Sequence, residues 1–115
     1  MRPDPFVRRV YLHRQPVDFR KSINGLAAIV EQELQLSPFS KELFVFVNRA
    51  RNRIKILLWE PNGFVLYYKR LEQARFHWPK QGDGLTVTLT GQQLNALLDG
   101  YNVEPHPELF YNSVQ

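Results

Sequence analysis

The residues best suited by type and spacing to do chemistry are four cations at every second position, Arg49, Arg51, Arg53 and Lys55. If the strands of a hairpin extend into this stretch, alternation places all four side chains on one face and Ile54 and Ile56 on the other. Such a row of charges fits the phosphate backbone of a nucleic acid, or a groove entered by a two-stranded ribbon. The alternative is a solvated hairpin tip whose charges prevent aggregation.

Arg20 and Lys21 form a second cationic pair, at the start of a predicted helix. Cations are unfavourable at the positive end of a helix dipole, and a bound anion would relieve that conflict. A third group mixes Lys69, Arg70, Arg75 and Lys80 with Tyr67, Tyr68, Phe76 and Trp78. Aromatic residues among cations suit stacking on unpaired bases, although alternating aromatic residues in a sheet more often form its core. We predict that Arg20, Lys21, Lys69 and Arg70 bind nucleic acid together with the first four cations.

Catalytic and metal-binding sites find no support in the residue pattern. The chain has no cysteine, which excludes disulfides, thiolate metal sites and cysteine nucleophiles. The histidines lie in separate segments without the spacing of metal ligands: His13, His77 and His106. Asp18, Glu60 and Glu72 have simpler roles as a helix cap, a hairpin end and an ion-pair partner than as converging ligands of catalytic metals. We therefore predict no catalytic residue, no metal, no cofactor and no enzymatic activity.

Charge is divided unevenly along the chain. The net charge is +4, but residues 1–80 contain all 15 Lys and Arg against 7 acids, whereas residues 81–115 contain 4 acids and no Lys or Arg. A basic body raises the local concentration of polyanions such as nucleic acids. An acidic C-terminal part next to a basic body also suits docking of a protein partner, and an ordinary solvated surface is the remaining alternative.

Length and composition predict one soluble domain spanning residues 1–115. The 115 residues suffice for one core but not for two. A hydrophobic fraction of 43% with 23% charged residues is typical of a folded chain. No stretch approaches the roughly 20 apolar residues of a membrane-spanning helix, and the N-terminus lacks the apolar core of an export signal. We expect a cytoplasmic protein, and the sequence leaves the oligomeric state open.

A short strand at 8–13 and a main helix at about 19–34 are the first elements that must position the cations. Asp18 stands where an N-cap belongs. Apolar residues follow at spacings of three and four: Phe19, Ile23, Leu26, Ala27, Val30 and Leu34. Gly25 costs about 1 kcal/mol relative to Ala inside a helix, which a close approach to a sheet would explain.

Beyond the helix the apolar period becomes that of strands. Aromatic and β-branched residues predict an antiparallel set at 43–47, 54–59, 64–68 and 75–78. The connections are a polar loop after residue 47 and the tight turn Pro61-Asn62-Gly63.

The C-terminal part predicts a further strand at 85–89, then a short helix from Thr90 or Gly91 to a C-cap at Gly100, and an irregular tail at 101–115. The predicted fold class is therefore α+β. It consists of an antiparallel β-meander of about five or six strands, one main helix packed on it and a short C-terminal helix.

Short motifs spread over residues 8–100 carry a resemblance to a known family. They are Asp18-Phe19-Arg20-Lys21-Ser22-Ile23-Asn24-Gly25-Leu26, Pro38-Phe39-Ser40, Leu43-Phe44-Val45-Phe46, Asn48-Arg49, Arg53-Ile54-Lys55-Ile56-Leu57, Trp59-Glu60, Gly63-Phe64, Lys69-Arg70-Leu71-Glu72, Phe76 and Trp78-Pro79. In these motifs the chain resembles the TnpB-type accessory protein, the second open reading frame product of IS sixty-six family insertion sequences. That family is unrelated to the RNA-guided nucleases that share the TnpB label.

The resemblance implies a small non-catalytic protein, encoded beside a separate and much larger transposase, that supports transposition of the element. With the cations above, we expect an accessory protein that binds the phosphate backbone of DNA through its basic hairpin and the surface around it. The alternative is a protein-interaction adaptor that binds the transposase or a sibling accessory protein without contacting DNA. An exposed sheet edge or the acidic C-terminal part would serve that role.

Overall fold

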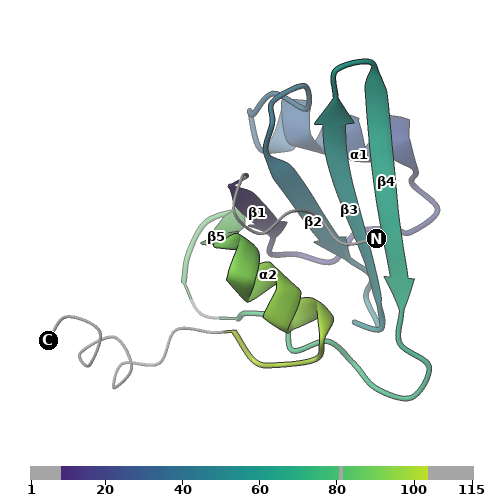
Figure 1. The fold of residues 1–115 in the computed structure, drawn as a ribbon, viewed down its shortest axis with the longest axis vertical. Coiled ribbons are helices and arrows are strands. Elements are labelled where there is room, and N and C mark those ends of the chain that lie inside the picture. The colour runs from purple at the N-terminus through teal and green to yellow at the C-terminus, as the bar shows by residue number, and fades with distance from the viewer. Residues whose placement is uncertain (1–8, 81, 104–115) are drawn as a thin grey trace, which may run out of the picture.

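The computed structural model describes residues 9–80 and 82–103, and its centre is one five-stranded sheet of order β4-β3-β2-β1-β5. The strands are β1 (Val10–His13), β2 (Leu43–Val47), β3 (Arg53–Glu60), β4 (Gly63–Arg70) and β5 (Thr86–Leu89). Two helical elements, α1 (Ile23–Ala28) and its π-helical continuation η1 (Ile29–Glu33), cover one face of the sheet. The remaining helix, α2 (Gly91–Leu98), lies against the other face (Figure 1). The α+β class is confirmed.

The two hairpins predicted from residue 43 onward are confirmed. β2 pairs antiparallel with β3, and β3 pairs antiparallel with β4 along its whole length. The register places Arg53 opposite Arg70 at one end and Glu60 opposite Gly63 at the other. Pro61-Asn62 closes the second hairpin, because these residue types supply the backbone angles of a tight turn.

The prediction of a purely antiparallel meander is wrong for β1. This strand pairs with β2 in parallel and with β5 antiparallel. The reason is the helical connection between β1 and β2, since a crossover of this length returns the chain to the same end of the sheet before the next strand starts. The sheet is therefore mixed, and β1 lies between two strands that are distant in the sequence.

The predicted strand at 75–78 is also wrong, because this segment has no ladder partner. The Phe76 N–H donates to the Arg51 carbonyl at 2.7 Å, and the Leu71 N–H donates to the Asn52 carbonyl at 2.8 Å. These bonds direct the chain across the end of the β2–β3 hairpin instead of along β4.

The main helix begins at Ile23, not at residue 19, and Asp18 is not its N-cap. Ser22 occupies the N-cap position and makes no side-chain capping bond. The Asp18 carboxylate instead accepts a hydrogen bond from the backbone N–H of Arg20 at 2.9 Å. Local side-chain bonds of this kind compete with helical hydrogen bonding and delay the start of the helix.

The apolar face predicted for the main helix is confirmed. Leu26 and Val30 are fully buried and belong to a core cluster with Phe44, Phe46 and Leu57 of the sheet. Gly25 has a different role from the expected close approach to the sheet. A Cβ at this position would lie 3.0 Å from the Cβ of Lys21, so the glycine makes room for the Lys21 side chain.

The second core lies on the face covered by α2. It contains Leu94, Leu97 and Leu98 of α2, Phe76 and Trp78, and residues of β1, β2, β3 and β5. Every residue of β2 is buried, because this strand is covered on both faces. No helix among the described residues is long and apolar enough to cross a membrane.

The predicted start of the C-terminal helix is confirmed, whereas its C-cap is Asp99, one residue before the predicted Gly100. Thr90 is its N-cap and forms a capping box with Gln93. Gly100 follows the last turn with a φ of 95°, a left-handed conformation that favours glycine. Of the predicted irregular tail, Val103 packs into the second core, and residues 104–115 lie outside the described residues.

Candidate nucleic-acid interface

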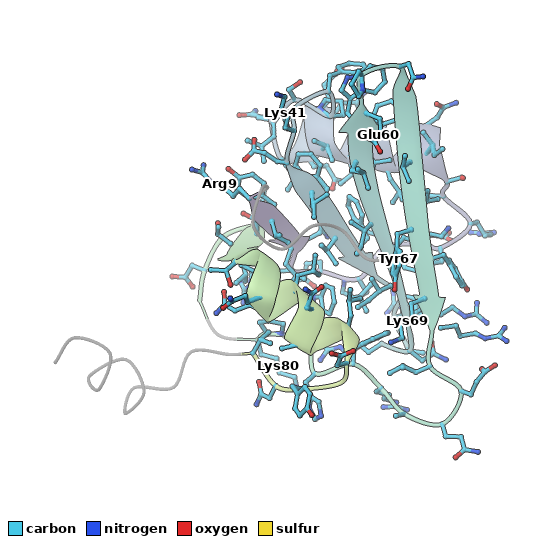
Figure 2. All side chains as sticks on the ribbon, viewed as in Figure 1. Arg9, Lys41, Glu60, Tyr67, Lys69 and Lys80 are labelled. Carbon is cyan, nitrogen blue, oxygen red and sulfur yellow. The ribbon has the colours of Figure 1, made fainter. Side chains whose placement is uncertain are left out.

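Most of the predicted cations lie at one end of the sheet. The turn 48–52 joins β2 to β3 there, and the paired residues Arg53 and Arg70 begin β3 and end β4. Figure 2 shows Lys69 towards this end of the sheet and Glu60 towards the opposite end. The sheet topology therefore gathers charges that are distant in the sequence.

The turn 48–52 is held rigidly by Asn48. Its side-chain oxygen accepts hydrogen bonds from the backbone N–H groups of Asn52 and Arg53, both at 3.0 Å. Its side-chain nitrogen donates to the Asn52 side chain at 2.7 Å, and its backbone carbonyl accepts from the Arg51 N–H at 3.0 Å. A polar turn whose backbone is fixed in this way presents its remaining side chains in a defined position.

Arg49 and Arg51 open onto two different hollows of the surface. The first, which we call the Arg49 hollow, has a volume of about 450 Å³ and is lined by residues 16–19 and 48–50. The second, the Arg51 hollow, has a volume of about 380 Å³ and also contains Arg75. Neither Arg49 nor Arg51 forms a side-chain hydrogen bond or ion pair with another described residue. Both guanidinium groups are therefore available to a ligand.

Lys55 does not belong to the exposed row, and the expectation that four cations share one exposed face is wrong. Alternation places Lys55 on the same side as Arg53, but residues 18–22 cover that position. Only 7% of Lys55 is exposed. Its Nζ donates to the carbonyls of Phe19 and Lys21 at 2.9 and 2.8 Å and lies 4.8 Å from the centre of the Phe19 ring.

Burial lowers the pKa of Lys55 below its usual value, because the ammonium has lost hydrating water. The two backbone carbonyls and the aromatic ring replace part of that hydration. Lys55 therefore fastens to the sheet the segment that carries Arg20 and Lys21, and it positions these cations instead of contacting a ligand itself.

Lys69 is also engaged within the fold. Its Nζ donates to the carbonyl of Leu98 at 2.7 Å. Leu98 is the last residue of α2, where the unsatisfied carbonyls and the negative end of the helix dipole attract a cation. Lys69 thus ties α2 to β4.

Arg20 and Arg70 form ion pairs with carboxylates two residues away. Arg20 binds Asp18 with nitrogen–oxygen distances from 2.6 to 3.1 Å, and Arg70 binds both oxygens of Glu72 at 2.9 and 3.0 Å. The hydrogen bonds from Arg20 lower the pKa of Asp18 to about 2, and that from Arg70 lowers the pKa of Glu72. The expectation that Glu72 is an ion-pair partner of Lys69 or Arg70 is confirmed, and the partner is Arg70.

The Asp18 pair predicts an unusual acid titration. We expect the Asp18 carboxyl to titrate with a midpoint of about 2 instead of the ordinary 3.8. Because the pKa is depressed in the folded state, the contribution of the pair to stability is complete above pH 3.8 and is lost as the pH falls through about 2. Carboxyl ¹³C NMR measures this midpoint. In Arg20→Gln the midpoint should move towards 3.8, and a wild-type midpoint already at 3.8 would contradict the pair.

Arg75 is a cation whose position the sequence alone did not indicate. Its neighbours Phe76 and Trp78 are each 3% exposed, and the Trp78 indole N–H donates to the carbonyl of His13 at 3.2 Å. Both aromatic residues are therefore core, not stacking platforms for bases. Arg75 and His77 alternate with them and are exposed. The alternation of Arg75 and His77 with the two aromatic residues is present in the sequence. The proximity of Arg75 to Arg51 depends on the tertiary fold.

The described acidic residues and histidines form no metal-binding group. Within residues 9–80 and 82–103, no three His, Asp or Glu side chains are placed to hold a metal ion. His13 is buried and lies 3.6 Å from a carboxylate oxygen of Glu33, and His106 lies outside the described residues. The arrangement can offer positive charge and guanidinium hydrogen bonds to an anion.

Comparisons with known proteins identify relatives over most of the chain. Residues 8–107 match the family described as IS66 Orf2 like protein. The chain is 33% identical over 92 residues to the uncharacterized protein y4jC of Sinorhizobium fredii, across 80% of this chain and 78% of that protein. It is 33% identical over 100 residues to y4hO of the same organism, across 87% and 85% of the two chains. No solved structure matches the chain.

Proposed function

This chain belongs to the IS66 Orf2-like family of transposition-associated accessory proteins, and we propose that it supports transposition by binding the phosphate backbone of DNA without catalysing a reaction. Turn 48–52 would be the centre of the contact. The observation that carries this proposal is the state of Arg49 and Arg51, which lie on a rigid turn and have no partner among the described side chains.

Unpartnered arginines favour a phosphate ligand for two physical reasons. A guanidinium presents its N–H groups in a planar fork that matches two phosphate oxygens, and charge-assisted hydrogen bonds of this kind are stronger than neutral ones. In addition, a rigid turn loses little conformational entropy when it binds. The same two side chains on a flexible loop would bind more weakly.

The surrounding cations divide into three groups in this proposal. Arg53 follows the turn directly as the first residue of β3, and Lys21 is exposed in the segment that Lys55 holds; both would add direct contacts. Arg20 and Arg70 are exposed but paired, so each must exchange a carboxylate for a phosphate and contributes less net affinity. Lys55 and Lys69 are excluded from the contact set because their amines bind backbone carbonyls.

One observation supports the adaptor as a second candidate. β4 is the last strand of the sheet on its side, so its outer edge has no strand partner among the described residues. An unpaired edge can accept a strand from another protein through main-chain hydrogen bonds. The transposase or a sibling accessory protein would then be the partner, and DNA would not be contacted.

Fluorescence anisotropy of labelled duplexes distinguishes the two candidates. The wild-type protein is titrated into an element-terminal DNA and an unrelated DNA at several salt concentrations. We expect both to bind at low salt, with the logarithm of affinity falling by about 0.9 per phosphate contact for each unit of log salt. If neither DNA binds at low salt and the transposase is captured in a pull-down, the adaptor takes the place of the DNA-binding function.

A further inference from the structure

The Arg51 hollow has a lining that differs from the rest of the basic end. It brings together three separate parts of the chain, namely Arg51, Arg75, Phe76, His77, Trp78, Lys80 and Asn102. Three of these seven described residues are cations and none is acidic. We infer that this hollow binds a phosphate group, with Arg51 and Arg75 as its ligands and Lys80 adding positive charge to the lining.

The walls of the hollow are fixed by hydrogen bonds within the fold. The backbone N–H of Phe76 donates to the Arg51 carbonyl at 2.7 Å and joins the two walls directly. The far end of the segment is held by Arg14, whose guanidinium donates to the Lys80 carbonyl at 2.8 Å. A site built on braced backbone needs little rearrangement when a ligand enters.

The side chains of both walls are directed by their neighbours. Because Phe76 and Trp78 are buried in the second core, Arg75 and His77 alternate to the outer side and are exposed. Arg51 has a φ of 62°, a left-handed backbone conformation that side chains with a Cβ rarely adopt. Glycine or asparagine would suit this turn position better, and strained positions of this kind are concentrated at ligand sites.

Two charges of the hollow, those of Arg51 and Arg75, lack the carboxylate partner found elsewhere at this end. Arg20 and Arg70 each have a carboxylate partner, whereas Arg51 and Arg75 form no ion pair with a described residue. Positive groups on one concave surface repel one another, and a bound phosphate between them offsets this repulsion by attracting each of them. The buried aromatic residues beneath them lower the local dielectric constant, which strengthens the attraction to an anion.

Phosphate chemistry is shared by a DNA backbone, a terminal phosphate and free phosphate. The DNA form of this inference rests on the proposed function, since a backbone that crosses the turn would meet Arg49 on one side and the Arg51 hollow on the other. Binding of phosphate itself is independent of that function. The experiment therefore needs a free-phosphate arm and a DNA arm.

In the first arm, inorganic phosphate is titrated into ¹⁵N-labelled protein against a chloride background. We expect the amide resonances of residues 75–78, Lys80 and Asn102 to shift in the wild type but not in Arg75→Ala. Lys41→Ala is the charge-matched control, because Lys41 is exposed and lies towards the opposite end of the molecule from Lys80 (Figure 2). It should titrate like the wild type. If Arg75→Ala also titrates like the wild type, the inference is overturned.

In the second arm, duplex DNA with or without a 5′-phosphate is titrated by anisotropy. Arg75→Ala should weaken both duplexes about 5- to 10-fold near 0.1 M salt and flatten the salt slope by about 0.9, as expected for one lost phosphate contact. An effect on the phosphorylated duplex alone would assign the hollow to a terminal phosphate.

The two proposals fail in different ways. If phosphate binds through Arg75 and no DNA binds, the proposed function fails and the phosphate site stands. If Arg49→Ala weakens DNA binding and Arg75→Ala does not, the function stands and the DNA form of the inference is overturned.

Discussion

Replacing Lys55 with Met is expected to lower the free energy of unfolding by about 2 kcal/mol. Methionine retains most of the apolar stem but donates no hydrogen bonds, so the carbonyls of Phe19 and Lys21 lose their partner. A carbonyl left without a donor costs about 1–3 kcal/mol when it is buried. The wild-type fold must desolvate the Lys55 ammonium, and Met removes that penalty. This gain offsets part of the loss at the two carbonyls, so we expect a net change at the lower end of the range for two unpaired carbonyls.

Chemical denaturation monitored by tryptophan fluorescence measures this change. Lys41→Met is the matched control, because the same substitution at an exposed position should leave the unfolding free energy within about 0.5 kcal/mol of the wild type. A second readout follows from the position of Lys55 under residues 18–22. Amide exchange in that segment should accelerate in Lys55→Met more than in α2. Unchanged stability together with unchanged exchange would show that Lys55 does not fasten the segment.

The parts of the fold that the sequence predicts well are those specified by local signals. Pro61-Asn62-Gly63 closes a hairpin because the backbone angles of these residue types permit few alternatives. Thr90 and Gln93 cap α2 by bonds between residues three apart. In such places residues close in the sequence determine the local structure. The predicted ends of these elements therefore differ from the observed ones by only a residue or two.

Long-range contacts decide the parts that sequence patterns miss. The alternation of Val10 and Leu12 predicts a strand but not its partners, and β1 pairs with strands on either side that begin more than thirty and seventy residues later. The delayed start of α1 follows from the Asp18 bond to Arg20 and from the burial of Lys55. Apolar residues at spacings of three and four predict which face of a helix is buried. They do not predict side-chain hydrogen bonds that compete with the first turn of the helix.

The candidate site shows the same limit. A period of two correctly separates Arg53 and Lys55 from Ile54 and Ile56, but it does not say which face another segment will cover. Residues 18–22 cover the face at Lys55, and α2 reaches Lys69 through the Leu98 carbonyl. The charge of a side chain is read from the sequence, whereas its freedom to bind a ligand depends on which carbonyls and carboxylates the fold places beside it.

The largest change in DNA binding is expected from removing the arginines that are free to bind a ligand. The double variant Arg49→Ala/Arg51→Asn removes two cations that have no partner among the described residues. Two lost phosphate contacts should flatten the salt slope by about 1.8 and weaken binding on the order of 10²-fold near 0.1 M salt, for element-terminal and unrelated DNA alike. Asparagine is chosen at position 51 because it tolerates the left-handed φ of 62°, so the unfolding midpoint should not fall.

The control for this variant is Arg9→Ala/Lys41→Ala, which removes the same charge at positions remote from Lys69 in Figure 2. General attraction between a basic protein and DNA depends on net charge, whereas direct contacts depend on where the charges lie. We expect the control to change the salt slope by much less than one unit and to retain most of the affinity. Equal losses of affinity in the two double variants would mean that DNA binding depends only on the net charge of the protein. Turn 48–52 would then not be the interface.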